Sequence, residues 1–295
     1  MSDSHSQSIY FIPDPSRWPI VGTLALFVSF IGAAIMLNGS AFGTFIFGMG
    51  IAAVIYMFSG WFAEVVGESL RGRYNKQVDV SFRWGMSWFI FSEVMFFAAF
   101  FGALYYARQF SVPWLGGDGH GFTTHEFLWP EFVADWPLLV IPDLEKFTSS
   151  LYTEVIPAMG VPALNTIILL SSGGTVTLAH WALKKNNRKG LCWWLLATIV
   201  LGFSFVSIQA HEYVHAYTEM NLKLSSGVYG STFFMLTGFH GCHVTLGATM
   251  LTVILLRSLK GHFSEHHHFA FEGVAWYWHF VDVVWLGLFI FVYWL

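Results

Sequence analysis

Long apolar runs separated by short polar segments set the pattern of this 295-residue chain. The clearest run lies between Arg83 and Arg108, where the 24 intervening residues carry one charge, at Glu93. As a helix this run would be about 36 Å long, enough to cross a hydrocarbon core of about 30 Å. The whole pattern predicts seven transmembrane helices, approximately at 19–37, 42–62, 83–107, 162–183, 191–211, 229–256 and 273–294.

The longest polar segment is an acidic stretch over 108–161, which we expect to lie outside the membrane. Its tryptophans at 114, 129 and 136 fit an interfacial cap, because indole rings favour the membrane surface. A solvated loop is the alternative interpretation. The chain has no internal repeat and no low-complexity linker, so we expect residues 1–295 to form a single domain.

A second pattern concerns how the first two helices meet. Ser40, Thr44, Gly48 and Ala52 recur at every fourth position. Small residues at this spacing let transmembrane helices approach closely. The alternative is chance, since the segment is rich in glycine and alanine.

Composition supports the membrane interpretation. The chain is 55% hydrophobic and 11% charged, whereas an ordinary soluble domain is about 25% charged. Its net charge of −4 with no long basic cluster gives no support to nucleic-acid binding. Cys192 and Cys242 are isolated, so neither a disulfide framework nor a thiolate metal site is expected.

The distribution of lysine and arginine predicts the orientation. Eleven of the fourteen lie at the N-terminus or in the loops that share its side of the membrane. Because cationic loops stay inside, the N-terminus is predicted to be cytoplasmic or on the matrix side and the C-terminus outside. The sequence shows no transit peptide, which favours a bacterial inner membrane, with a periplasmic C-terminus, over a mitochondrial one.

Glu93 is the most informative single residue. It lies about 15 Å from Arg83 along a helix, at the middle of the membrane. Placing a charge there costs roughly 2.5–3.5 kcal/mol, so the carboxyl should be protonated or paired. His243 lies at a similar depth in the 229–256 run and is the predicted hydrogen-bond partner. Its neighbour His240 is a further candidate, and a haem or metal role for the two histidines is the weaker alternative.

Other polar side chains within the apolar runs remain open to two interpretations. His279 and Asp282 are three residues apart and can bond along one helix face. They could relay protons or simply hold helices together, and the sequence does not choose. In the loop before the last helix, Arg257, Lys260 and a histidine triplet are expected to bind anionic lipid head groups, with a metal tract as the alternative.

The sharpest short motif is His211, Glu212 and His215, which has the H-E-x-x-H spacing of zinc proteases. Asp282 would be the third ligand, but it lies about 15 Å away in depth. We therefore expect an interfacial polar cluster here, with an intramembrane zinc protease as the alternative, and no metal site in the chain. A third alternative is a transporter with Glu93, His243 and Asp282 as a proton relay, although inverted repeats are absent.

Several stretches resemble subunit III of cytochrome c oxidase. They are Arg83–Met86 with Phe91–Phe97, Leu164–Thr166, Ser172–Gly173, Ala179–His180, Gly238–Val244, and His267–Phe269 with Trp276–Trp285. The resemblance spans all seven predicted helices. It implies an all-α fold in two groups, the first two helices and the other five, which form a V-shaped cleft that holds phospholipids.

The resemblance also implies a function. The chain would be a non-catalytic, cofactor-free subunit of a proton-pumping aa3-type oxidase, which reduces O2 to water with electrons from cytochrome c. Haem a, haem a3 and copper B would belong to subunit I and copper A to subunit II. The subunit would support proton uptake, O2 access and turnover stability of subunit I.

Residue-wise matching assigns two kinds of site. Glu93 matches the family's buried, carbodiimide-sensitive carboxyl. Trp61, Glu68, Arg257 and His267 match residues that line the lipid cleft. Arginines expected near the end of the second helix are replaced by Ala63 and Gly67, and Arg71 and Arg73 are the alternatives for that head-group contact.

Overall fold

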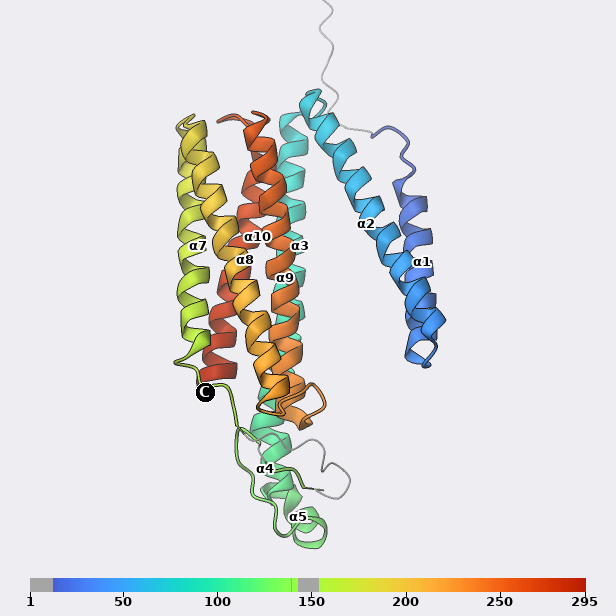
Figure 1. Cartoon of the computed structure of the whole chain (residues 1–295), viewed down its shortest axis with the longest axis vertical. Helices are drawn as coiled ribbons and strands as arrows, with labels where there is room; N and C mark the ends of the chain where they lie inside the picture. The colour runs from blue at the N-terminus through green and yellow to red at the C-terminus, as the bar shows by residue number, and fades with distance from the viewer. Residues whose placement is uncertain (1–12, 139, 143–153) are drawn as a thin grey trace, which may run out of the picture. The chain divides into compact units, whose positions relative to one another are not determined.

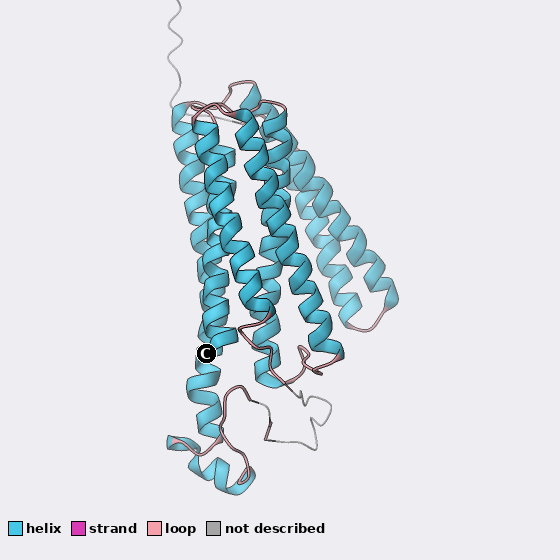
Figure 2. Ribbon diagram, turned by 60° about the vertical axis from the view of Figure 1, so that its left-hand side comes forward, coloured by secondary structure: helices cyan, strands magenta, loops and turns pink. Residues whose placement is uncertain are grey.

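A computed structural model describes residues 13–138, 140–142 and 154–295 of the chain. These residues form helices and loops with no strand among them (Figures 1 and 2). Seven helices are long and apolar enough to cross a membrane. The predictions of an all-α fold and of seven transmembrane helices are therefore confirmed. The chain is a multi-pass membrane protein.

The chain divides into two compact units, Met1–Phe82 and Arg83–Leu295. This division matches the predicted grouping of the first two helices apart from the later ones, with the boundary inside the third helix. That the whole chain is a single domain remains a prediction.

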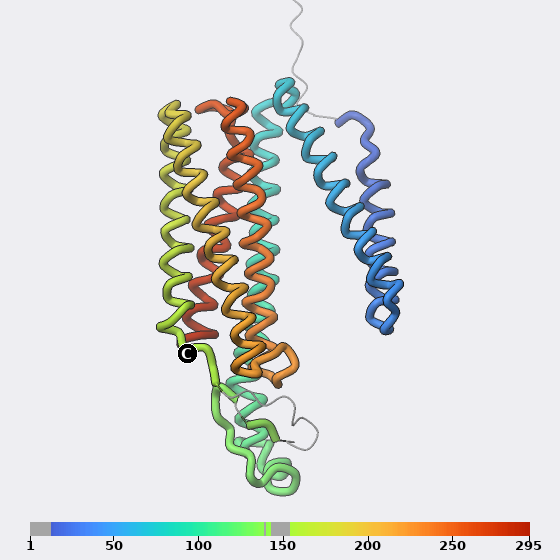
Figure 3. The backbone as a smooth tube through the Cα atoms, viewed as in Figure 1, coloured from blue at the N-terminus to red at the C-terminus, as the bar shows by residue number. Residues whose placement is uncertain are grey.

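The first unit is a helical hairpin of α1 (Trp18–Leu37) and α2 (Ala41–Leu70), joined by a short turn that the tube in Figure 3 shows in blue. Gly32 and Gly43 mark the contact, because a Cβ on either would lie within 2.3 Å of the partner helix's backbone. Gly48 has nothing within 4 Å of its Cβ position. The prediction that Ser40, Thr44, Gly48 and Ala52 face α1 was therefore wrong. Helix α2 packs through the face that carries Gly43 and Gly50.

The second unit is a bundle of long helices (Figure 1). Its members are α3 (Lys76–Tyr106), α7 (Val161–Lys184), α8 (Arg188–Thr218), α9 (Gly227–Leu259) and α10 (Phe269–Leu288), and the π-helical turn η4 (Phe289–Trp294) extends α10. Helix α7 packs along α8, α8 along α9, and α10 against both α9 and α7. Aromatic rings join α3 to α9 and α10.

Trp278 of α10 lies at the centre of this bundle and is fully buried. Two glycines make room for its indole: a Cβ at Gly202 of α8 would lie 2.7 Å from the ring, and one at Gly247 of α9 would lie 2.8 Å from it. The indole Nε1 donates to Ser172 Oγ of α7 at 2.9 Å. One side chain thus joins α7, α8, α9 and α10, and its polar atom is satisfied within the apolar core.

Several helices are longer than the apolar runs that predicted them. Helix α2 continues to Leu70, α3 begins at Lys76 rather than Arg83, and α8 continues to Thr218. At the start of α3, Asn75 Oδ1 accepts from Val78 N at 2.9 Å, a helix N-cap that holds this end in place. Hydropathy marks where a helix crosses hydrocarbon, whereas capping decides where it ends.

The predicted outer loop is partly helical. It contains the π-helical η1 (Ala107–Ser111), α4 (Val112–Leu115), the 3-10 turn η2 (Gly119–Gly121) and α5 (Phe122–Leu128). Val112, Phe132 and Leu138 form a small core of their own. The ring of Trp136 lies against Tyr229 of α9 at 5.8 Å. The acidic residues 143 and 145 and the lysine at 146 lie outside the described residues.

Candidate functional site

The candidate site is built around Glu93 on α3 and His243 on α9. Glu93 Oε2 lies 2.9 Å from His243 Nε2, within hydrogen-bond distance. The two side chains are 22% and 14% exposed, so the pair is largely enclosed yet reaches the surface of this chain. The structure therefore brings together the two residues that sequence depth had paired.

The protonation of this pair follows from its second contact. His243 Nδ1 lies 2.6 Å from the backbone oxygen of Phe239, an atom that can only accept. Nδ1 must therefore carry a proton, which leaves Nε2 to face Glu93. The contact requires one proton between the two groups, either on the carboxyl or on the imidazole. The pair can thus hold a proton that moves over a short distance.

Aromatic rings surround the pair. The Phe97 ring lies 5.0 Å from the imidazole of His243, and Tyr277 of α10 stacks on it at 6.3 Å. Phe89, one turn before Glu93, stacks on Tyr277 at 6.1 Å. These rings keep water away from one side of the pair and fix the imidazole, so the polar contact is oriented by apolar packing.

His240, the other predicted partner, does not reach Glu93. Its Nε2 donates to the backbone oxygen of Val281 at 3.1 Å, and its ring packs against Phe205 and Trp285. Three residues turn a helix by about 300°, which directs His240 towards α8 and α10 while His243 faces α3. The assignment of His240 as a partner of the carboxyl was therefore wrong.

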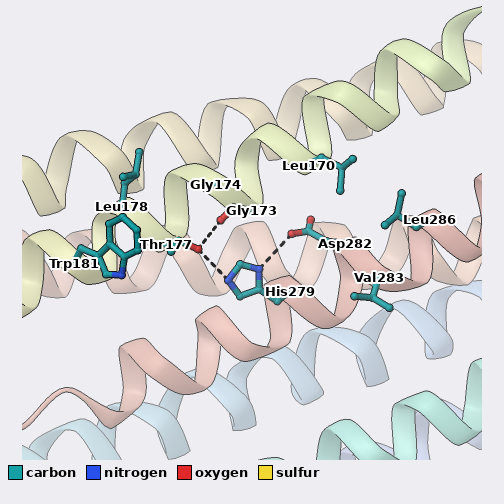
Figure 4. Close-up of a pocket in the computed structure, with 10 residues that line it drawn as sticks. All are labelled: Leu170, Gly173, Gly174, Thr177, Leu178, Trp181, His279, Asp282, Val283 and Leu286. Atoms are coloured by element: carbon teal, nitrogen blue, oxygen red, sulfur yellow. Dashed lines mark hydrogen bonds and ion pairs between the residues drawn. The ribbon is translucent and has the colours of Figure 1, made fainter.

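His279 and Asp282 meet on α10 as predicted, with His279 Nδ1 3.5 Å from Asp282 Oδ2. Figure 4 shows both at an open pocket between α7 and α10. Asp282 lies against Gly173, where an added Cβ would be 2.3 Å from Oδ2, and His279 Nε2 lies 3.3 Å from Thr177 Oγ1. Their contacts are with α7, whereas Glu93 and His243 lie between α3 and α9, so the three-residue relay of the transporter hypothesis is not assembled.

The H-E-x-x-H motif is divided between the core of the bundle and its surface. Glu212 is buried, and Tyr293 donates to it at 2.8 Å and Gln209 at 3.3 Å. His211 and His215 are exposed, and His215 pairs with Glu219 at 3.1 Å. That these residues form an interfacial polar cluster stays a prediction, and the contacts of Asp282 are with α7 instead.

A polar cluster that sequence reasoning missed joins the ends of α3, α7 and α10. Arg83 forms an ion pair with Glu272 Oε2. On the other carboxylate oxygen, His180 Nε2 lies at 3.4 Å and His268 Nε2 at 3.2 Å. The available signal was the spacing of His268 and Glu272, four residues apart where the last apolar run begins, but no local pattern connects them to residues 83 and 180.

The predicted lipid-binding residues of the first unit differ in exposure. Trp61 is 46% exposed, whereas Glu68 is only 8% exposed and accepts from Tyr74 Oη at 2.6 Å. Burial, together with the bond to Glu68, raises the pKa of the Tyr74 phenol. Arg71 donates to the backbone oxygen of Gly67 at 3.1 Å, and Arg73 pairs with an aspartate, residue 14. Both arginines therefore have partners within the chain.

The predicted lipid-binding residues of the second unit lie in the last turn of α9 and in the loop that follows it. The Arg257 guanidinium lies 4.6 Å above the ring of Phe263, and its Nε is buried without a hydrogen-bond partner. Lys260 ends α9 and is exposed, and His267 is exposed in the loop that follows. These three cationic or ionisable groups lie at one end of the bundle.

Comparison with known proteins identifies the family of this chain. The family model for cytochrome c oxidase subunit III matches residues 8–126 and 127–295. Cytochrome c oxidase subunit 3 of Dugong dugon and that of Pongo abelii are each 40% identical to this chain over 292 residues, and that of Carassius auratus is 39% identical. Each alignment covers 99% of this chain and 98% of the relative. The resemblance read from the motifs is thereby confirmed, and the chain belongs to the cytochrome c oxidase subunit III family.

Proposed function

We propose that the chain is an accessory subunit of a proton-pumping aa3-type cytochrome c oxidase and carries no redox centre itself. The complex reduces O2 to water with electrons from cytochrome c. Haem a, haem a3 and copper B belong to partner subunit I and copper A to partner subunit II. Membership of the cytochrome c oxidase subunit III family supports this proposal.

The contact between Glu93 and His243 is the observation that supports a specific role for this subunit. A carboxyl and an imidazole that share one proton at mid-membrane form a local proton reservoir. Both side chains are partly exposed at the surface of this chain. The surface of α3 next to Glu93 is apolar and open, with Phe89 46% exposed and Val94 45% exposed. We assign this face to the contact with subunit I, where the pair supports proton uptake and protects the enzyme during turnover.

A second part of the proposal is phospholipid binding. Arg257 and Lys260 supply positive charge at one end of the bundle, and His267 adds a polar imidazole there, which suits an anionic head group. In the first unit, Trp61 offers an exposed indole, and Glu68, Arg71 and Arg73 lie at the polar end of the hairpin. The acyl chains of the bound phospholipids would also offer O2 an apolar route to subunit I.

We assign the chain to a bacterial inner membrane, with the N-terminus cytoplasmic and the C-terminus periplasmic. The excess of lysine and arginine on the N-terminal side supports this orientation. The lipid-binding residues 257, 260 and 267 then belong to the cytoplasmic leaflet, where anionic lipids attract basic residues.

The test is the Glu93→Gln variant of the purified oxidase complex. Glutamine keeps the size and the hydrogen bond but cannot release a proton. We expect near-normal initial O2 consumption with faster loss of activity during sustained turnover. Asp282→Asn, which removes a buried carboxyl facing α7, is the matched control and should show normal endurance. Immediate loss of electron transfer in Glu93→Gln would contradict an accessory role, and unchanged endurance would contradict the role of Glu93.

A further inference from the structure

Three potential metal ligands converge where α7 and α10 meet the polar loops. His180 Nε2, His268 Nε2 and one oxygen of Glu272 all lie within 4.8 Å of one another. The three side chains are 22%, 9% and 12% exposed, so the cluster is well shielded from solvent. Among the described residues this is the one group of three histidine, cysteine or acidic side chains with such spacing.

The two imidazole nitrogens are poorly satisfied. Both Nε2 atoms are buried and neither makes a hydrogen bond, although each lies near Glu272 Oε1. His268 Nδ1 lies 3.0 Å from the backbone oxygen of Ser264, which can only accept, so Nδ1 carries the proton. In its neutral form, His268 then points a lone pair at a carboxylate oxygen. A cation between these atoms would relieve their repulsion.

The spacing suits a tetrahedral transition metal. Zinc binds imidazole nitrogen and carboxylate oxygen at about 2.0–2.2 Å, which places neighbouring ligand atoms about 3.3 Å apart. The two nitrogen-to-oxygen distances in the cluster are 3.4 and 3.2 Å. The hydrogen bond of His268 Nδ1 to Ser264 is also the kind of outer contact that orients metal-binding histidines.

From this geometry we propose that His180, His268 and Glu272 form a binding site for a divalent transition-metal cation of the Zn²⁺ type, with the fourth position open to water. Arg83 holds the other carboxylate oxygen, so Glu272 binds through Oε1 alone. The guanidinium also adds positive charge nearby, which weakens metal affinity. Mg²⁺ and Ca²⁺ prefer oxygen ligands and do not suit a site with two imidazoles.

The site is tested by zinc uptake of the purified oxidase complex that contains this chain. The complex is stripped with a chelator and dialysed against increasing free Zn²⁺, and zinc is counted per chain by mass spectrometry. We expect His180→Ala and His268→Ala to bind one zinc fewer than the unmodified complex. His266→Ala is the matched control, since His266 is 81% exposed and pairs with Glu265 at 3.2 Å. It should keep the full zinc content.

A second variant distinguishes loss of the metal site from loss of folding. Glu272→Gln can still accept from Arg83, and we expect it to assemble but to bind this zinc at least tenfold more weakly. Excess Mg²⁺ should not displace the metal, and zinc-edge X-ray absorption should show two imidazoles in the unmodified complex and in His266→Ala, but not in His180→Ala or His268→Ala. Equal zinc content in all variants, or a site that takes Mg²⁺ as readily as Zn²⁺, would overturn the proposal.

Discussion

Glu93 Oε2 and His243 Nε2 lie 2.9 Å apart although 150 residues separate them in the chain. The contact joins α3 to α9, and the bond of His243 Nδ1 to Phe239 decides that a proton lies between the two groups. A polar pair between two membrane-spanning helices therefore depends on an imidazole whose orientation is fixed by its own helix.

The first prediction concerns the hydrogen bond of Glu93. Replacing His243 with phenylalanine removes the partner that lies 2.9 Å from the carboxyl oxygen. The infrared band of this carboxyl in the complex should then shift in frequency relative to the unmodified protein. The band should vanish in the double variant with Glu93→Gln. A spectrum unaffected by His243→Phe would mean that the imidazole does not control the carboxyl.

The second prediction concerns Arg83 and Glu272, which join α3 to α10 by an ion pair. The arginine side chain is 36% exposed and the glutamate 12%, so solvent screens the pair only in part. We expect a double-mutant cycle with Arg83→Gln and Glu272→Gln, in chelator, to give a coupling of about 1–3 kcal/mol in unfolding free energy. Lys185→Gln, an exposed change at the same end, should be close to neutral. A coupling near zero would show that the pair is an ordinary surface contact.

The third prediction concerns the space beside Trp278. Gly202→Ala places a methyl group 2.7 Å from the buried indole, so the ring of Trp278 or the helix α8 must shift. Overpacking of this kind costs about 1–3 kcal/mol. Gly174→Ala is the matched control on α7, because nothing lies within 4 Å of its Cβ position. Thermal unfolding should separate the two variants, and equal melting temperatures would show that the core accommodates the methyl group.

The fourth prediction concerns pH and the pair of Asp14 and Arg73. The hydrogen bond and charge of Arg73 lower the pKa of Asp14 below its usual value. A lowered pKa means that the pair contributes fully above the unfolded pKa of about 3.9 and is lost as pH falls through the folded value. The protection of residues 14–18 against hydrogen exchange, measured relative to the intrinsic exchange rate at each pH, should therefore fall at acid pH. Arg73→Gln should remove this dependence, and an identical profile in that variant would contradict the pairing.

Much of the fold could be predicted because a bilayer makes simple demands on sequence. Each membrane-spanning segment must be apolar over about 20 residues. The seven apolar runs therefore correspond to seven helices in the part of the chain that the structure describes. The depth of a polar residue in the membrane follows from the number of residues between it and the end of its apolar run. By this count Glu93 and His243 lie at similar depths, and they were therefore predicted to be partners. Helix ends were less predictable, since caps such as Asn75 act in water beyond the apolar run.

Tertiary structure alone decided which side chains meet across helices. Sequence could not tell that His240 turns towards Val281, that Glu212 bonds Tyr293, or that Gly43 rather than Gly48 faces α1. The rotation of each helix about its axis is set by packing of many side chains on its neighbours, not by hydropathy, which is nearly uniform around a membrane helix. The cluster of His180, His268 and Glu272 arises the same way, from the ends of two helices that only the folded bundle brings side by side.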